Sequence, residues 1–302
     1  MKRQNKWSKE IAELSKRRYK QMDGELYNYY KDALKELKVE VNQYLKDYDK
    51  LTFSQKMQVD RQLRVARQVD EILADLSGKA TQTVDAFVRD ELQLGYNSVW
   101  YTVESMEKVQ LDFAMLPERY IEQLVNQPVD GRTFSKRLYD YREELADHVT
   151  DELLRGARRG EGYAKVAKRV GDLTEASYKQ ALRIAETEGG RTQSAAKQKS
   201  YEEAEQLGVR IQKQWIATLD EKTRSSHADL DGQIVDIDDY FTSSLGNKAL
   251  GPNLFGVAGE DIRCRCSTLT VVNGLSPDTR RDNITDEVID YVNYEEWAMD
   301  RL

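Results

Sequence analysis

A histidine and a closely spaced pair of cysteines near the end of the chain have the clearest capacity for chemistry. His227 precedes Asp231 by four residues, and Cys264 and Cys266, the only two cysteines, are separated by one residue. Imidazole, thiolate and carboxylate groups are the usual ligands of Zn²⁺, so these four side chains could complete a tetrahedral zinc site. A disulfide between such close neighbours is not expected, because the small ring would be strained.

Three interpretations of this set stay open. Zinc sites usually carry cysteines at C-x-x-C or wider spacing, and the chain has no second pair. That favours two half-buried thiols and a histidine that holds the loop by hydrogen bonds. A zinc ion bound by His227, Asp231, Cys264 and Cys266 is the second interpretation. The third is a cysteine nucleophile, for which Arg265 would favour the thiolate, but the sequence shows no residue that would orient the imidazole.

Carboxylates in the same half of the chain allow an enzymatic interpretation. A metal-dependent nuclease would need Asp220, Asp231, Glu186 and His227 to gather within about 5 Å of one another around a divalent ion. Glu186 and Glu188 lie two residues apart on a predicted helix, where such positions point about 200° apart. We therefore expect one of them to pair with a nearby arginine instead of sharing a site with the other.

A basic cluster lies in the middle of the chain around three glycines. Glycine lets a backbone approach a phosphate, and clustered lysines and arginines give salt-dependent affinity for DNA without reading its sequence. The cluster predicts a contact face for double-stranded DNA, with a solvated helix surface neutralised by nearby glutamates as the alternative. The net charge of −7 argues against a protein that coats nucleic acid over its whole surface. The cluster consists of Arg155, Arg158, Arg159, Lys165, Lys168 and Arg169.

The elements that position these residues are predicted to be mainly helical. Apolar residues recur every three or four positions from Leu26 to Leu51, which predicts a long helix whose stripe is buried against another helix or a partner. Further helices are predicted over 54–76, ended by Ser77-Gly78, and over about 81–108, with a bend near Gly95. The chain from 133 to 208 is predicted to be helical in shorter pieces, interrupted by glycines including Gly156 and Gly171.

The pattern changes to strands after Gly208. Alternating residues from Val209 to Ala217, the segment Gln233–Val235 after an Asp-Gly turn, and Ser267–Val272 predict three antiparallel strands. The fold class is therefore α+β, with mainly helical N-terminal and middle regions and a small antiparallel sheet near the C-terminus. We expect three parts: a helical region 1–130 for attachment, a module 131–274, and an acidic tail 275–302.

The chain carries no sign of a membrane or a secreted protein. No run of about 18 apolar residues occurs, and the N-terminus is charged, with no apolar segment of the kind found in signal peptides. Together with the two unpaired cysteines, this predicts a soluble protein made in a reducing cytoplasm.

An ordered series of motifs between Ala185 and Val272 resembles the C-terminal module of phage minor head proteins of the MuF type. The series begins with Ala185-Glu186-Thr187-Glu188, continues as W-x-A-x-x-D-x-x-T-R-x-x-H-x-x-L-D-G over 215–232, and closes with Cys264-Arg265-Cys266. Each motif is weak alone, but the ordered set over about ninety residues is specific. The structural residues of the motif would be Trp215, Asp220, Arg224, Gly232, Phe241 and Arg265.

The resemblance implies a structural protein of a tailed phage or prophage, without catalytic residues. Such a protein would act in head morphogenesis inside the virion, near the portal, and would contact the portal protein, scaffold or major capsid protein and the packaged DNA. An enzyme packaged in the head, either a nuclease or an ADP-ribosyltransferase, is the alternative. ADP-ribosyltransferases carry an E-x-E after an arginine and a serine-rich strand, whereas here the serine-rich segment 242–244 follows Glu186 and Glu188.

Overall fold

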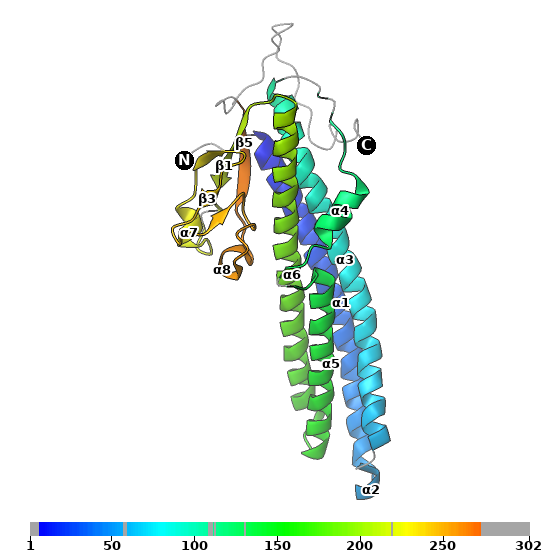
Figure 1. The fold of residues 1–302 in the computed structure, drawn as a ribbon. Helices are drawn as coiled ribbons and strands as arrows, with labels where there is room; N and C mark the ends of the chain where they lie inside the picture. Colours follow the sequence, from blue (N-terminus) through cyan, green and yellow to red (C-terminus); the bar gives the residue numbers. More distant parts are fainter. Residues whose placement is uncertain are drawn as a thin grey trace. The chain divides into compact units, whose positions relative to one another are not determined.

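Long helices and one small sheet make up the part of the chain that the structure describes. The computed structural model describes residues 6–56, 59–107, 111, 113–129, 131–218 and 220–272. The predicted α+β class is confirmed (Figure 1). The helices are α1 (Lys6–Asp49), α2 (Phe53–Lys56), α3 (Val59–Glu107), α4 (Glu118–Val125), α5 (Phe134–Arg158), α6 (Tyr163–Gln206), α7 (Ser225–Ala228) and α8 (Ala258–Asp261). The strands are β1 (Ile211–Ile216), β2 (Ile234–Asp236), β3 (Phe241–Thr242), β4 (Lys248–Ala249) and β5 (Ser267–Val272).

These elements form two compact units, and α1, α3 and α6 contribute residues to both. The first unit is drawn from the ranges 1–19, 87–126 and 186–302, and the second from 20–86 and 127–185. The division of the sequence into 1–130, 131–274 and 275–302 stays a prediction, and the acidic tail lies outside the described residues. None of the described helices combines the length and apolar character needed to cross a bilayer.

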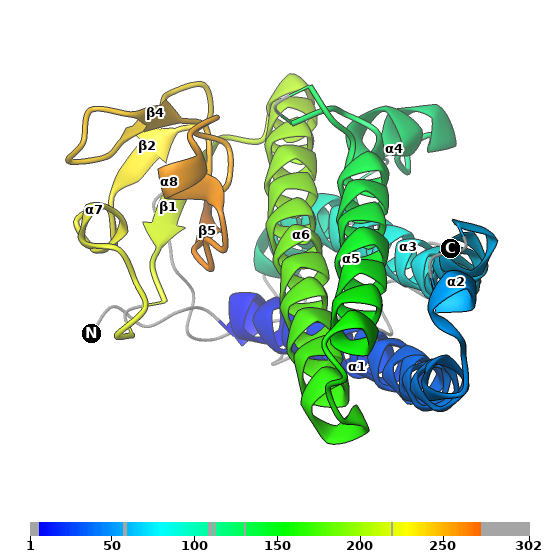
Figure 2. The same cartoon turned by 90° about the horizontal axis from the view of Figure 1, so that it is seen from below.

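The second unit is a bundle of helices around the apolar stripe predicted for α1. Leu26, Leu37 and Val41 are fully buried, and Tyr178 of α6 donates a hydrogen bond to Asp23 of α1. Helices α5 and α6 run side by side in both views (Figures 1 and 2). Because the stripe is buried within the bundle, it cannot be the surface that docks on another protein.

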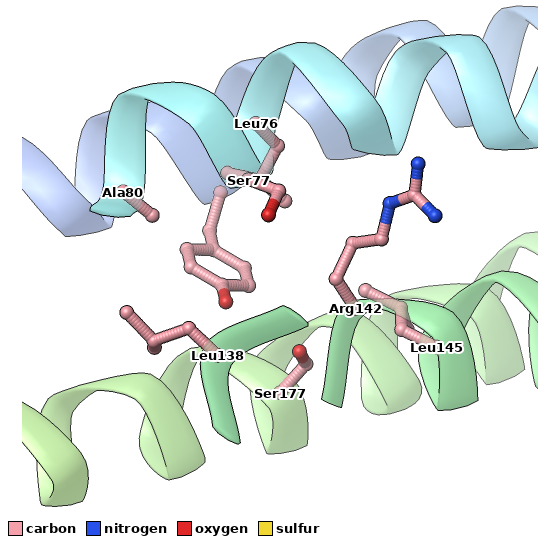
Figure 3. A pocket seen from close by; sticks show the side chains of 8 residues that line it. Leu76, Ser77, Ala80, Leu138, Arg142, Leu145 and Ser177 are labelled. Carbon is pink, nitrogen blue, oxygen red and sulfur yellow. The ribbon is translucent and has the colours of Figure 1, made fainter. Parts of the chain in front are cut away.

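A small gap between the helices of this bundle is lined by residues of α1, α3, α5 and α6 (Figure 3). Leu76 and Ala80 of α3 face Leu138 of α5 across it, and Ser177 of α6 borders it. Tyr30 and Ser77 also line it, and Arg142 at its edge pairs with Asp70 of α3 at 2.8 Å. Such a small gap is a packing defect of the kind that helical cores tolerate.

The helices are longer than predicted, because three glycines do not end them. Ser77-Gly78 lies inside α3, Gly171 lies inside α6 and Gly156 lies inside α5. A glycine costs a helix only about 1 kcal/mol, which burial of a continuous apolar stripe outweighs. Gly156 is a packing residue, since a Cβ there would lie 2.5 Å from Cγ2 of Val166 on α6.

The sheet of the first unit is antiparallel with the order β2-β1-β5, so β1 is central. Trp215 of β1 lies opposite Thr268 of β5, and Gln214 lies opposite Ile234 of β2. Strands β3 and β4 form a separate two-stranded sheet. The core of this region is a cluster of buried apolar residues: Trp215, Ala217, Leu230, Phe241, Ala249 and Phe255.

The C-terminal part of α6 is joined to this sheet by buried polar contacts. The ammonium of Lys197 donates to the carbonyl of Thr268 at 3.1 Å, and Gln198 donates to the carbonyl of Ile237 at 3.0 Å. Lys213 of β1 is buried and donates to the same Ile237 carbonyl at 2.6 Å. These bonds fix the sheet against the helix that carries Glu186 and Glu188.

Candidate metal centre

His227 lies in a short helix that follows β1, with its ring buried among aromatic side chains. The turn α7 places it 1% exposed, edge-on to Trp215 with ring centres 5.5 Å apart and stacked on Phe255 at 5.6 Å. Between α7 and β2 the chain turns at Gly232, whose φ of +80° is a conformation that favours glycine. The imidazole is therefore held in one orientation by packing on both sides.

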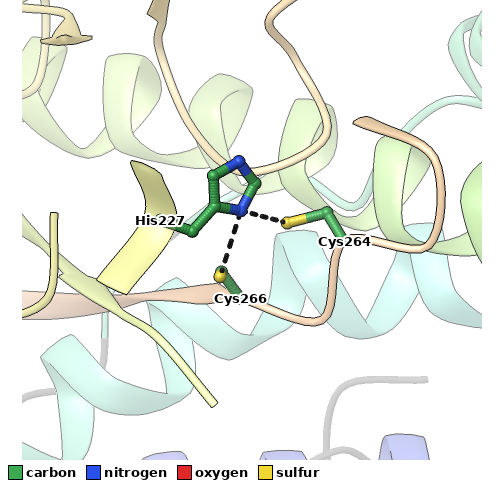
Figure 4. Close-up of side chains that lie close together, drawn as sticks. All are labelled: His227, Cys264 and Cys266. Atoms are coloured by element: carbon green, nitrogen blue, oxygen red, sulfur yellow. Dashed lines mark hydrogen bonds between the residues drawn. The ribbon is translucent and has the colours of Figure 1, made fainter. Parts of the chain in front are cut away.

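Both cysteine sulfurs lie against the same nitrogen of His227 (Figure 4). Nδ1 is 3.4 Å from Sγ of Cys264 and 3.6 Å from Sγ of Cys266. The ligand atoms of the three residues all lie within 4.8 Å of one another. Residues i and i+2 of an extended segment point to the same side, which lets both sulfurs face the ring while Arg265 points away.

The other ring nitrogen of His227 meets a carboxylate that the sequence analysis missed. Nε2 is 2.9 Å from Oε2 of Glu260, which is 1% exposed and also accepts hydrogen bonds from Ser226, Ser243 and Asn247. Burial alone would raise the pKa of Glu260, but these hydrogen bonds and His227 lower it, so the carboxylate is ionised. Nothing in the sequence distinguishes Glu260 from the adjacent Asp261. Only the fold shows that Glu260 is the carboxylate beside His227.

The carboxylate settles which nitrogen of His227 carries the proton. An ionised Glu260 accepts and does not donate, so Nε2 bears a hydrogen, and in the neutral ring the Nδ1 lone pair points at the sulfurs. Burial opposes protonation of His227, yet its pKa is raised overall by the hydrogen bond with Cys264 and by Glu260.

The two thiols differ in acidity because they share a hydrogen bond. The contact with Cys266, together with burial, raises the pKa of Cys264, whereas the contact with Cys264 lowers the pKa of Cys266. A thiolate beside an oriented imidazole could coordinate a metal ion or act as a nucleophile.

The remaining predicted zinc ligand is not part of this cluster. Oδ1 of Asp231 accepts the backbone N–H of Ala217 at 3.0 Å, a bond that ties the turn after α7 to the end of β1. Among the described residues, the group of candidate ligands contains His227, Cys264 and Cys266 only. Asp231 is therefore a structural residue in this geometry.

The other motif residues brace the site. Arg265 forms a two-pronged ion pair with Asp220, at 2.5 Å for each nitrogen–oxygen contact. Arg224 donates to the carbonyl of Ile262, which joins the start of α7 to the segment before Cys264. Trp215 and Phe241 are fully buried with ring centres 5.1 Å apart, as expected for core residues.

The carboxylates of the proposed enzymatic sites are separately engaged. Glu188 is 1% exposed and pairs with Arg191 at 2.9 Å, as expected for a helical neighbour. Glu186 accepts hydrogen bonds from Tyr19 and Arg263. Since Asp220 and Asp231 are also bound elsewhere, the carboxylates that a nuclease site would need do not gather around His227.

An open groove of about 630 Å³ borders the cysteines. Its walls come from the first part of α1, the later parts of α3 and α6, and the segment leading into β5. Cys264 and Cys266 line it together with Arg263, Arg265 and Glu186. Cys266 is partly exposed beside the groove, whereas Cys264 and the imidazole are buried.

The basic cluster lies at the turn between α5 and α6 and is partly neutralised. Arg155 and Arg169 pair with Glu152, while Lys165 and Arg169 pair with Glu161. These contacts lower the pKa of Glu161 to about 2. Exposed cations that form no ion pair with the described residues complete the cluster, namely Arg158, Arg159 and Lys168.

Comparison with known proteins identifies the family. Residues 147–269 match the family model described as "Phage Mu protein F like protein". The minor head protein GP7 of Bacillus phage SPP1 is 31% identical over 287 residues, which is 92% of either chain. The chain belongs to the phage Mu protein F-like family. The predicted MuF-type resemblance is thereby confirmed.

A longer relative of this Mu F-like chain carries an enzymatic name. The NAD(+)–arginine ADP-ribosyltransferase EFV of Enterococcus faecalis is 44% identical over 298 residues, which is 99% of this chain. The present chain spans only 61% of that protein's length. No solved structure matches the chain significantly.

Proposed function

We propose that this chain is a minor head protein that acts in phage head morphogenesis, inside the virion and next to the portal. The observation that carries the proposal is the similarity to GP7 of SPP1, which extends over 92% of both chains and so covers the helical half as well as the sheet. Family membership makes the chain a phage head protein, and the portal, the scaffold or the major capsid protein are its proposed partners.

The surface that meets those partners is proposed to lie on exposed apolar side chains outside the buried stripe. Tyr27 and Val39 of α1 are 53% and 63% exposed, and Leu63 of α3 is 49% exposed. Apolar side chains left exposed on long helices are surface that a partner protein could bury.

Contact with packaged DNA is proposed for the turn between α5 and α6. Arg158, Arg159 and Lys168 are exposed there, and unpaired cations on one turn suit the phosphate backbone. Arg155, Lys165 and Arg169 are committed to Glu152 and Glu161, so their part in DNA binding is expected to be small.

An ADP-ribosyltransferase is the second candidate, because of the name of the enterococcal relative. Two observations weigh against extending that activity to this chain. The match leaves 39% of the relative's length uncovered (100% minus 61%), and Glu188 is buried in a pair with Arg191. We therefore propose a structural role for the residues present here.

The decisive experiment locates the chain in assembled heads. Heads purified from induced cells should contain the chain, protected from protease until the heads are opened, and heads made without it should be fewer or defective. Absence from purified heads would exclude the proposed role. Incubation of the purified chain with labelled NAD⁺ and an arginine-rich acceptor protein should leave the acceptor unlabelled, and labelling would favour the second candidate.

A further inference from the structure

We propose that His227, Cys264 and Cys266 bind one Zn²⁺ ion through Nδ1 and the two sulfurs, with the fourth coordination position open to the groove. This goes beyond a role in head assembly and does not depend on it. Three observations carry it: the distances between the ligand atoms, the partner of the second ring nitrogen, and the placement of the sulfurs beside open space.

The distances match the edges of a zinc tetrahedron. Zinc binds sulfur at about 2.3 Å and imidazole nitrogen at about 2.0–2.1 Å, so tetrahedral angles place nitrogen and sulfur about 3.5 Å apart. The two observed distances from Nδ1, to Cys264 and to Cys266, are 3.4 and 3.6 Å.

A hydrogen bond alone explains the arrangement less well. The Nδ1 lone pair can accept one good hydrogen bond, yet two sulfurs lie at almost equal distances from it. A nucleophilic cysteine would likewise need only one of them. A cation bound by both sulfurs and the nitrogen would explain why these three atoms converge on one point.

Glu260 supplies the second sphere of a zinc site. Histidines that bind metals usually donate their other N–H to a carboxylate, which fixes the ring and increases its basicity. Glu260 is 2.9 Å from Nε2 and is itself held by Ser226, Ser243 and Asn247. That network leaves Nδ1 as the free ligand nitrogen and aims it at the sulfurs.

The fourth ligand is expected to be water or a group that enters the groove. Asp231 is engaged with Ala217, and the described residues place no carboxylate among the candidate ligands. Both cysteines line the groove, so the ion is reachable from there. Three protein ligands and one open position are typical of zinc sites that exchange their fourth ligand.

Metal content of the full chain tests the proposal directly. The chain, purified without an affinity tag or chelator, should contain about one zinc per molecule, measured by mass spectrometry of the elements. The double variant Cys264→Ser, Cys266→Ser should lose at least nine-tenths of it. His148→Ala removes the other histidine, which is exposed, and should retain the full content. Asp231→Asn should also retain it.

Cobalt substitution keeps the test independent of variants that fail to fold. Wild-type chain stripped of metal and titrated with Co²⁺ should show the intense visible bands of tetrahedral cobalt and a near-ultraviolet thiolate band. Cys266→Ser should lose about half of that thiolate band, and Glu260→Gln should weaken Co²⁺ affinity by about 10- to 100-fold. Wild-type protein that carries no zinc and shows no tetrahedral cobalt spectrum would overturn the proposal, as would a double cysteine variant with wild-type zinc content.

Discussion

Gly95 of α3 lies directly against the backbone of Gln193 of α6, so that a Cβ on Gly95 would be 2.3 Å from the Gln193 carbonyl oxygen. The contact continues along the two helices. Ser200 donates to the carbonyl of Tyr96 at 2.9 Å, and a Cβ on Gly189 would lie 2.6 Å from the Phe87 ring. Gly95 was predicted to mark a bend, but its role in this structure is to admit a second helix.

The first prediction concerns that contact. Gly95→Ala should lower the free energy of unfolding by at least about 2 kcal/mol, because the new methyl group meets backbone, which cannot rotate away. Gly24→Ala is the control, since nothing lies within 4 Å of its Cβ, and it should raise stability by up to about 1 kcal/mol. Urea unfolding followed by circular dichroism measures both, and equal effects would contradict the packing argument.

A second prediction follows from a buried carboxyl beside the same helices. Burial raises the pKa of Glu91 to about 7, from an ordinary value of 4.5, although Ser15 and Gln193 donate to its Oε2. The folded protein then binds this proton more tightly than the unfolded chain, so stability falls as the pH rises from about 4.5 to about 7. A shift of this size corresponds to about 3 kcal/mol.

Glu91→Gln should remove that loss. The variant should match the wild type within about 0.5 kcal/mol at pH 4 and exceed it by up to about 3 kcal/mol at pH 7.5 in urea unfolding. Lys197 titrates outside the pH range from about 4.5 to about 7. Burial lowers its pKa to about 8, so its titration makes the free energy of unfolding rise with pH only above that value. If the free energy of unfolding of the two proteins changed in parallel with pH, Glu91 would not be the titrating group.

The third prediction concerns the turn between α5 and α6. The double variant Arg158→Ala, Arg159→Ala should weaken binding to duplex DNA of any sequence and reduce the slope of log affinity against log salt by up to about 2. Arg155→Ala is the matched control, because that side chain pairs with Glu152, and it should change the slope little. Fluorescence anisotropy at several salt concentrations measures both. An unchanged slope in the double variant would remove the turn from the proposed DNA contact.

The fourth prediction compares two adjacent aromatic residues. Phe241 is fully buried against Trp215, whereas Tyr240 is 54% exposed. Phe241→Ala should cost about 3–5 kcal/mol of stability through the cavity that it leaves, and Tyr240→Ala should cost less than about 0.5 kcal/mol. Thermal unfolding measures both, and similar melting temperatures for the two variants would contradict the assigned core.

Local patterns in the sequence were sufficient to predict the long helices and the three strands of the larger sheet, but not all of their ends or the short elements α4, α8, β3 and β4. The stripe from Leu26, the strand Ser267–Val272 and the α+β class were predicted from periodicity and are confirmed. The ends predicted at Ser77-Gly78 and Gly171 were wrong, because the cost of a glycine is local whereas the stripe that overrides it spans many turns.

The site was predictable only where its residue types are rare. His227, Cys264 and Cys266 stand out in a chain with two cysteines and two histidines, and the structure brings them together. Asp231 and Glu260 could not be distinguished by sequence, since the chain contains 53 acidic residues and either could have reached the ring. Long-range hydrogen bonds, from Asn247 to Glu260 and from Ala217 to Asp231, assign the two roles.

Strand β5, the last described element, completes a sheet whose central strand precedes it by some fifty residues, and the same compact unit also includes Ser15 of α1, which bonds to Glu91. The ribosome therefore makes Ser15 about 250 residues before it makes β5, although both belong to this unit. At about 5–20 residues per second, the start of α1 is made on the order of tens of seconds before β5. Folding of this unit is therefore expected to finish only after β5 has been made, because β1 lacks one of its two partner strands until then.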